Sequence, residues 1–459
     1  MEERYIATVD LGTSKIALSV AKVEDEHVTV IYYRETPSEG ILYSAVINPM
    51  KASVPLKAAI SEAEKELGIT ITQVAVGLPR YSIKQEATSS TVSRSNPEGL
   101  IDADEVQCLG DMALDSFKLA NPNEQEIYGA VIQSYSTDDF IQGSAEDIIG
   151  TTSASISGNF KLFVGARKAT RNLDLLFNGL NVAIARKYFL PDASARAVLT
   201  DSEMEGGVAL VEIGGGVSSV TVYHGGILRY FGSIPFGGKV VTSDIRMECG
   251  LHTELAENIK LAYGACLPDR LQSLEGKVLQ ISDDETANYS EIQVKFLSQI
   301  ITARMREILE AVLYLIQESG YADRLRCGVV LTGGGAGLVN TGVMLGEMSG
   351  YTVRAGFPRI KNLSHQGCEG LGEMSAAATV GMILEARSDK YLGCAGEAAA
   401  QEEQEQDLGG TVFAPEAESR PEPRKKPEKK HRSRFLGSIK KSIENGFDGT
   451  IGGLFDEMQ

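Results

Sequence analysis

Residues 4–15 read Arg-Tyr-Ile-Ala-Thr-Val-Asp-Leu-Gly-Thr-Ser-Lys, an apolar stretch that leads into a polar turn. Residues 4–10 are predicted to form a buried strand, Gly12–Ser14 a tight turn, and residues 15–23 a second strand. The turn offers backbone N–H groups, two hydroxyls and one ammonium group beside the Asp10 carboxylate. Because Mg2+ prefers hard oxygen ligands, this set suits a phosphate held next to Mg2+. The alternative is an ordinary polar hairpin turn, because Asp-x-Gly-Thr is a common turn sequence.

Two further glycine loops also follow apolar strands directly. Residues 207–213 form a predicted strand that ends at the acidic Glu212 and continues into Gly214–Gly216, whose backbone can approach a phosphate closely. Residues 329–332 lead into Gly333–Ala336, an uncharged loop that suits a flat ring or a ribose. Each loop alone could be a simple bend. The repetition of the strand-loop-strand pattern predicts two similar lobes that face each other across a cleft, and the set of three loops favours nucleotide binding.

Composition and known motifs exclude several classes of protein. The 459 residues carry a formal charge of −18, which argues against a general nucleic-acid surface. The six cysteines are irregularly spaced and no signal peptide precedes them, as expected for a reducing cytosol. Neither a P-loop nor a Rossmann glycine motif is present. The sequence also contains no apolar run long enough to span a membrane, so any membrane contact is predicted to be superficial.

The rest of the chain predicts an insertion and further core helices. Residues 80–163 become more polar and are predicted to form an inserted subdomain. The strand 162–165 is expected to resume the core, and helices are predicted at 253–263 and 293–318. An alanine-rich helix after Pro191 is predicted to pack closely against another helix.

The C-terminal part of the sequence predicts a linker and an amphipathic helix. Residues 395–423 are an Ala/Glu/Gln/Pro run without apolar periodicity. Seven Arg and Lys residues follow between Arg424 and Arg434. In a helix, five apolar side chains would then form one stripe, and a basic run beside such a stripe favours binding to an anionic membrane surface. A partner-binding helix is the alternative. The stripe consists of Phe435, Leu436, Ile439, Ile443 and Phe447.

The three loops resemble the two phosphate loops and the adenosine loop of the actin, Hsp70 and hexokinase superfamily. More narrowly, the chain resembles the FtsA family of bacterial cell-division proteins from about residue 4 to 386 and in its tail. The matching stretches are 10–16, 207–216, 233–238 with Thr242 and Asp244, and 256–260 with Gly264. This resemblance implies an α/β, actin-like, two-lobed fold with duplicated ribonuclease-H-like cores, an insertion in the first lobe and a C-terminal amphipathic helix on a disordered linker.

The resemblance also implies domain boundaries. These are 1–79 with 164–195 for the first core, 80–163 for the inserted subdomain, 196–243 with 317–388 for the second core, 244–316 for a further subdomain, 389–432 for a linker with the basic run, and 433–459 for the membrane-targeting segment.

The implied cofactors are ATP and Mg2+. Asp10 and Glu212 would hold the metal, and Glu257 and Lys260 would contact the ribose or adenine. The full implied nucleotide site is Gly12, Thr13, Ser14, Lys15, Gly214, Gly215, Gly216, Glu257, Lys260, Gly333, Gly334, Gly335 and Ala336. Glu212 and Val217 depart from the family pattern, which has Asp and then hydroxyl residues in the second loop. We therefore expect at most a slow ATPase, and no residue is assigned as a catalytic base.

By the same resemblance, the protein would form filaments with itself and tether the division protein FtsZ to the membrane. It would lie as a peripheral protein on the cytoplasmic face of the membrane at the division site, contact an anionic membrane surface and other divisome proteins, and bind no nucleic acid. Three other functions stay open: a small-molecule kinase of the same superfold, an Hsp70-like chaperone and a related pilus-assembly homologue. The tail counts against all three, and it is too short for the chaperone's peptide-binding domain.

Overall fold

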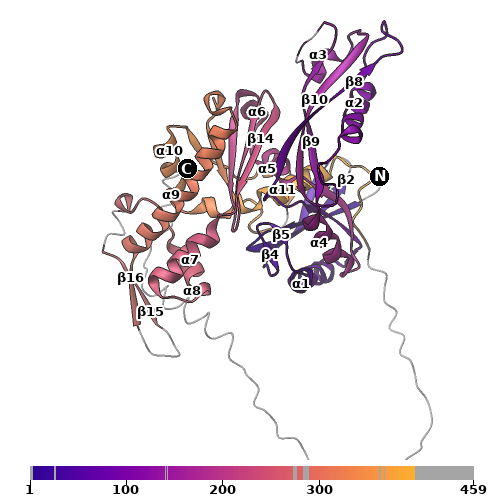
Figure 1. Cartoon of the computed structure of the whole chain (residues 1–459). Helices are drawn as coiled ribbons and strands as arrows, with labels where there is room; N and C mark the ends of the chain where they lie inside the picture. Colours follow the sequence, from indigo (N-terminus) through magenta and orange to yellow (C-terminus); the bar gives the residue numbers. More distant parts are fainter. Residues whose placement is uncertain are drawn as a thin grey trace, which may run out of the picture. The chain divides into compact units, whose positions relative to one another are not determined.

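A computed structural model describes residues 4–397, except for 25–26, 140, 142, 272–275, 283–288, 361–362 and 366. These residues belong to one compact unit, 1–399 (Figure 1). The predicted amphipathic stripe between Phe435 and Phe447 lies outside the described residues, as does the basic run. Among the helices that the structure describes, none is long and apolar enough to cross a membrane.

The first core is built on a mixed sheet with the strand order β3-β2-β1-β7-β11. β2 pairs antiparallel with β1 and β3, whereas β7 runs parallel to both β1 and β11. β1 and β2 are the predicted hairpin, and their central residues are buried because the sheet is covered on both faces. The strands are β1 (Arg4–Leu11), β2 (Lys15–Glu24), β3 (His27–Pro37), β7 (Gln73–Gly77) and β11 (Ala183–Tyr188).

The second core repeats this arrangement with the order β14-β13-β12-β17-β18. β13 is again antiparallel to its two neighbours, and β17 is again parallel to β12 and β18. The predicted duplication of the core is therefore confirmed. The strands are β12 (Val208–Ile213), β13 (Ser218–His224), β14 (Ile227–Ile234), β17 (Val329–Thr332) and β18 (Val353–Ala355).

Helices connect and cover these two sheets. Two of them match their predicted ranges closely, namely α8 and α9. The helices of the two cores are α1 (Pro49–Leu67), α4 (Arg167–Asn178), α5 (Leu190–Val198), α6 (Asp201–Gly206), α7 (Gly238–Cys249), α8 (Thr253–Tyr263), α9 (Val294–Glu318), α10 (Thr341–Ser349) and α11 (Ala377–Ala386). A two-stranded hairpin, β15 (Val278–Ser282) and β16 (Tyr289–Gln293), precedes α9.

The last helix of each repeat, α5 or α11, packs against the sheet of the other repeat. α5 contacts β13 of the second sheet, and α11 contacts β1, β2 and β7 of the first. The two helices also pack on each other, and a Cβ built on Gly381 of α11 would lie 2.0 Å from the carbonyl oxygen of Ala193 of α5. The predicted close packing of the alanine-rich helix is thus confirmed, and the crossing ties the two lobes together.

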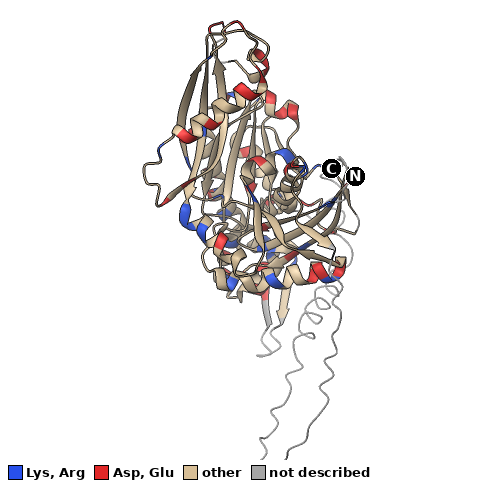
Figure 2. Cartoon of the chain, turned by 90° about the vertical axis from the view of Figure 1, so that its right-hand side faces the viewer, with Lys and Arg blue, Asp and Glu red and all other residues tan. Residues whose placement is uncertain are grey.

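The insertion forms a three-stranded sheet with the order β8-β10-β9, covered by α2 (Figure 1). The strand 162–165 was expected to resume the core, but it is the end of β10, which pairs along its length with β8 and β9. A short apolar run looks the same in either sheet, so the local pattern could not separate them. Acidic residues recur along α2 (Figure 2). The elements are β8 (Lys84–Ser93), α2 (Ala103–Ser116), β9 (Gln125–Ser136), α3 (Ala145–Ile148) and β10 (Ser155–Ala166).

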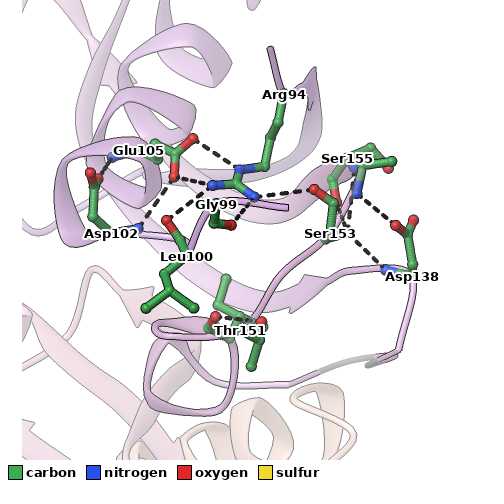
Figure 3. A network of polar contacts seen from close by, with 11 residues as sticks. Arg94, Gly99, Leu100, Asp102, Glu105, Asp138, Thr151, Ser153 and Ser155 are labelled. Atoms are coloured by element: carbon green, nitrogen blue, oxygen red, sulfur yellow. Dashed lines mark hydrogen bonds and ion pairs between the residues drawn. The ribbon is translucent and has the colours of Figure 1, made fainter. Parts of the chain in front are cut away.

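Arg94 holds the insertion together at the start of α2 (Figure 3). Its Nε and Nη2 donate to the two carboxylate oxygens of Glu105, both at 2.9 Å. Its Nη1 and Nη2 also donate to the carbonyl oxygens of Gly99, Ser153 and Leu100. Every nitrogen of this buried guanidinium group therefore has a partner, as a buried cation requires.

The folded unit continues beyond residue 388, where the linker was predicted to begin. Strand β20 (Ala395–Glu397) pairs antiparallel with β6 (Ile69–Ile71), and Ala395 also pairs with Tyr5 of β1. The Cys394 N–H donates to the Tyr5 carbonyl oxygen at 2.7 Å, and the Cys394 side chain is fully buried. Residues 389–397 are therefore part of the first lobe, and the prediction of a linker from residue 389 is corrected to this extent.

Candidate functional site

The first and second glycine loops lie in direct contact. A Cβ built on Gly215 would lie 2.0 Å from the Ser14 hydroxyl oxygen, and one on Gly216 would lie 2.7 Å from the Thr13 hydroxyl oxygen. A side chain at either glycine would therefore collide with Ser14 or Thr13 of the first loop, and one of the two would have to move. The structure brings the two predicted phosphate loops together, although they are far apart in the sequence.

The first loop is held in shape by hydrogen bonds to its backbone and to Thr13. The Gly12 N–H donates to the Lys15 carbonyl oxygen at 2.9 Å and closes the turn. The Ser38 hydroxyl donates to the Thr13 carbonyl oxygen at 2.8 Å, and the Ser44 N–H donates to the Thr13 hydroxyl oxygen at 3.0 Å. Because the Thr13 hydroxyl accepts this bond, its own hydrogen stays available as a donor to a ligand.

Lys15, the predicted phosphate-binding cation, forms an ion pair with Glu35 of β3. The Tyr33 hydroxyl donates to the same carboxylate. Burial of the Tyr33 ring, followed by the charge of Glu35, raises the pKa of this phenol far above its usual range. Tyr33 therefore stays a donor, and Glu35 holds the Lys15 ammonium group at the side of the first loop.

Lys239, which the sequence analysis did not single out, joins the second lobe to the first loop. It is the second residue of α7, and its ammonium group donates to the Thr13 carbonyl oxygen at 2.5 Å. The N–H groups of Gly238 and Lys239 donate to the carbonyl oxygens of Gly214 and Gly215. Burial lowers the pKa of Lys239. The stretch 233–238, which resembles the FtsA family, ends one residue before Lys239. The contact between Lys239 and Thr13 depends on the fold and could not be predicted from the sequence.

The third loop packs on the second. Gly333 has a φ of +88°, and a Cβ there would lie 2.6 Å from the Ile213 carbonyl oxygen. A Cβ on Gly335 would lie 2.7 Å from the Ile213 side chain and 3.1 Å from the Gly214 carbonyl oxygen. Both positions therefore require glycine. Gly334 is less confined, since its nearest neighbour, the Ser375 Cβ, is 3.6 Å away.

Glu257 and Lys260 of α8 lie beside the start of α7. The Lys260 ammonium group donates to the Gly238 carbonyl oxygen at 3.2 Å, to the Thr242 hydroxyl oxygen at 2.9 Å and to both oxygens of Glu257 at 2.9 and 2.8 Å. A Cβ on Gly238 would lie 3.9 Å from the Gly335 Cα. Because Lys260 donates to the Gly238 carbonyl oxygen, Lys260 and Glu257 lie next to the third loop. Its contact with a ribose or adenine stays a prediction.

The two predicted metal-binding carboxylates differ in their surroundings. Glu212 forms an ion pair with Arg80, and each side chain is only 10% exposed. Within the described part of the chain, the Asp10 carboxylate makes no hydrogen bond or ion pair, although its backbone lies opposite Ala17 in the sheet. The same part of the chain holds no group of three or more metal-binding side chains. An Mg2+ ion held mainly through water and phosphate oxygens needs only one such carboxylate. Asp10 fits this role, whereas Glu212 fits it only if it leaves Arg80.

Comparison with known proteins gives one consistent family. The family model described as "Cell division protein FtsA" matches residues 209–381. The cell division protein FtsA of Neisseria meningitidis serogroup B is 28% identical over 78% of this chain and 85% of its own length. That of Streptococcus pneumoniae serotype 2 is also 28% identical, over 78% and 76%, and that of Bacillus subtilis is 26% identical, over 78% and 79%.

Solved structures share the fold at much lower identity. A PilM-PilN type IV pilus biogenesis complex matches 84% of this chain and 98% of its own chain, with a TM-score of 0.55 and 13% identity. MreB5 of Spiroplasma citri bound to ADP matches 84% and 97%, with a TM-score of 0.50 and 12% identity. These likenesses concern the fold, which is actin-like, and they extend over both lobes.

Proposed function

We propose that this chain, which belongs to the cell division protein FtsA family and has an actin-like fold, binds ATP where its three glycine loops meet. One observation carries the proposal. Glycines at 215, 216, 333 and 335 leave room for the neighbouring loop where any side chain would collide with it. Backbone, hydroxyl and ammonium donors from both lobes gather at this point, which supports binding of a polyanion between the lobes.

Each group of residues has a proposed part in holding the nucleotide. The backbone and hydroxyls of residues 12–15 and the backbone of residues 214–216 would bind the phosphates, with Lys15 and Lys239 as nearby cations. Residues 333–336, Glu257 and Lys260 would bound the adenosine. Asp10 would hold Mg2+ through water, and the bound ion would neutralise phosphate charge.

ATP turnover is proposed to be slow or absent. Glu212, the acid of the second loop, is engaged by Arg80, and Val217 provides no hydroxyl in that loop. Hydrolysis requires the water and metal to be positioned within a fraction of an ångström. A wild-type rate like that of kinases, roughly 1 to 100 per second, would contradict this part of the proposal.

The biological role that we propose is a filament-forming adaptor that tethers FtsZ rings to the cytoplasmic face of the membrane at the division site. Family membership supports cell-division partners. The sequence of the tail supports the membrane part, because seven cationic residues precede the apolar stripe from Phe435 to Phe447. Each cation can contribute about 1 kcal/mol near an anionic leaflet, which suits reversible binding.

Nucleotide binding is tested by thermal unfolding of the full chain with saturating Mg-ATP. Asp10→Ala and Gly334→Asp should each abolish the ATP-dependent rise in Tm, the first through the metal and the second through a charge placed beside the adenosine. Both variants should fold. Asp10→Ala removes a carboxylate that has no partner among the described residues, and Gly334 has room for a Cβ. Gly393→Asp, where a Cβ would meet nothing within 4 Å, is the matched control and should keep the full shift. Unchanged shifts in both site variants would remove this site.

The adaptor role is tested by sedimentation with vesicles that contain anionic phospholipid. The full chain should pellet and bring FtsZ with it, whereas a chain that ends at residue 423 should leave both in the supernatant. Phe435→Glu or Ile439→Glu should act like the truncation while the ATP-dependent Tm shift persists. If the truncated chain pelleted as well as the full chain, the tail would be a partner-binding segment.

A further inference from the structure

We infer that Arg80 is a nucleotide-binding residue, and that its Nε and Nη2 bind two oxygens of the terminal phosphate of ATP. This inference deepens the proposed function and rests on it. Arg80 is 8% exposed, and its Nη1 donates to Glu212. Its Nε and Nη2 are buried and have no hydrogen-bond partner among the described residues.

The Arg80 Nε and Nη2, which have no partner among the described residues, form a pair of donors, here called the fork, that can bind one oxyanion through two parallel hydrogen bonds. In a guanidinium group, Nε–H and one Nη2–H are parallel and lie along one edge, so they match two oxygens of one carboxylate or phosphate. In the described part of the chain, one carboxylate fills this edge in Arg94, Arg304 and Arg354, through Glu105, Asp244 and Glu203 respectively. In Arg80 the same edge is buried and has no such partner among the described residues.

The contrast with Arg94 indicates a ligand. Both arginine side chains are largely covered, with 4% exposed in Arg94 and 10% in Arg80, and Arg94 uses all three of its nitrogens within the insertion. Burying guanidinium N–H groups without partners is costly, so a position that keeps two of them buried is more readily explained by an oxyanion that completes the fork.

The position of Arg80 identifies which oxyanion this is. β7 runs parallel to β1 with Thr8 opposite Ala75 and Val9 opposite Val76, so the chain after β7 leaves the sheet at the same edge as the first loop. Glu212 is opposite Thr332 in β17, directly before the second and third loops. The guanidinium group that pairs with Glu212 therefore lies where the proposed phosphate loops begin.

The charges favour the terminal phosphate of a triphosphate. Glu212 neutralises the charge of Arg80, and the Nε and Nη2 of Arg80, which no described residue engages, remain free to bind an anion. Because Arg80 comes from the first lobe and Glu212 from the second, an ATP phosphate on this fork would be held by both lobes at once. ADP lacks the terminal phosphate and would leave the fork empty.

The experiment is calorimetric titration of the full chain with ATP and, separately, with ADP. Arg80→Lys keeps the charge but removes the fork, and it should weaken ATP binding by about tenfold to a hundredfold, the range of charge-assisted hydrogen bonds, while ADP binding changes less than about twofold. Arg34→Lys is the matched control, because Arg34 pairs with Glu62 and Glu66 on the surface of the same lobe, and both affinities should stay at wild-type values.

A single substitution at Arg80 could unfold the protein by leaving Glu212 buried without its partner, so a double variant serves as the second test. Arg80→Gln with Glu212→Gln removes both buried charges together and should fold while losing the preference for ATP over ADP. Wild-type protein that binds ADP as tightly as ATP, or folded variants that keep the wild-type preference, would overturn the role of Arg80 while leaving nucleotide binding intact. Wild-type protein that binds neither nucleotide would overturn both the role and the proposed function.

Discussion

The core β3-β2-β1-β7-β11 and the core β14-β13-β12-β17-β18 share one strand order and one set of strand directions. The acidic residues at the ends of their corresponding strands have different surroundings. Asp10 and Glu212 are the penultimate residues of the corresponding strands β1 and β12. Among the described residues Asp10 is unpaired, whereas Glu212 forms a buried ion pair with Arg80 of the other lobe. The duplicated backbone thus supplies two equivalent positions, and the side chains around each decide which carboxylate is left without a partner and could bind the proposed metal ion.

Removing the two acidic charges one at a time tests this asymmetry most strongly. Glu212→Gln leaves the Arg80 cation buried without its partner and should lower the free energy of unfolding by about 3 to 5 kcal/mol. Asp10→Asn should change it by less than about 1 kcal/mol, because no described partner is lost. Urea unfolding of both full-length variants measures the difference. Equal losses would mean that the two acids are equivalent after all.

The crossing of α5 and α11 is where the two repeats depend on each other. Gly381→Ala places a methyl group 2.0 Å from the Ala193 carbonyl oxygen, so the helices must separate. This should cost about 3 kcal/mol, at the upper end for overpacked sites. Gly346→Ala in α10 of the second repeat is the matched control, because its Cβ would lie 3.6 Å from the nearest atom. It should be neutral or stabilise by up to about 1 kcal/mol through helix propensity. Similar Tm values for both variants would contradict this close packing of α5 and α11.

The sequence predicted what short-range pattern determines. Each glycine loop follows a buried strand, and the structure has β1, β12 and β17 at those places. The long amphipathic α9 was also predicted to within one residue. In these cases the residues that determine the structure are neighbours in the chain, so their spacing alone carries the information.

The sequence could not predict what depends on distant partners. Arg80 follows an unremarkable Gly-Leu-Pro, and its partner Glu212 is 132 residues away. Strand β20 lies at the start of a low-complexity run, and its pairing with β6 and Tyr5 depends on residues from the other end of the chain. For the same reason Lys239 was missed, because its bond to Thr13 joins opposite lobes. Contacts between lobes leave no periodic signal in either segment.

The helix crossing also predicts a pH dependence. Burial, followed by the negative charge of Asp192, raises the pKa of Glu385 on α11 to about 7, and Arg196, 3.3 Å away, opposes this shift. The hydroxyls of Tyr188 and Tyr223 are the other titratable groups nearby. Because the folded state holds this proton more tightly than the unfolded state, the contribution to stability is complete below pH 4.5 and is lost as the pH rises through 7.

Glu385→Gln should remove this loss. At pH 8 the variant should be more stable than the wild type by about 3 kcal/mol, and at pH 4.5 the two should be alike. Thermal unfolding at intervals between these pH values measures the effect. Asp389→Asn, whose carboxylate pairs with the exposed Arg186 just beyond α11, is the control and should leave the profile of the wild type unchanged in this range. Parallel profiles for the wild type and Glu385→Gln would mean that Glu385 is ionised throughout.

The smallest expected effect concerns the outer edges of the two sheets. Beyond β3 the first sheet continues with β19 (Ser364–His365), whereas the edge strand β14 of the second is met by side chains of the insertion. Gln85 of β8 donates to the Phe231 carbonyl oxygen at 3.0 Å and accepts from the Phe231 N–H at 3.3 Å, so one side chain replaces a pairing strand. Gln85→Ala should therefore cost about 1 kcal/mol and increase hydrogen exchange at the Phe231 amide. Gln280→Ala in β15, which loses only a 3.4 Å contact with Glu291, should change stability by less than about 0.5 kcal/mol. If exchange at Phe231 were unaffected, β14 would be protected by packing and not by the insertion.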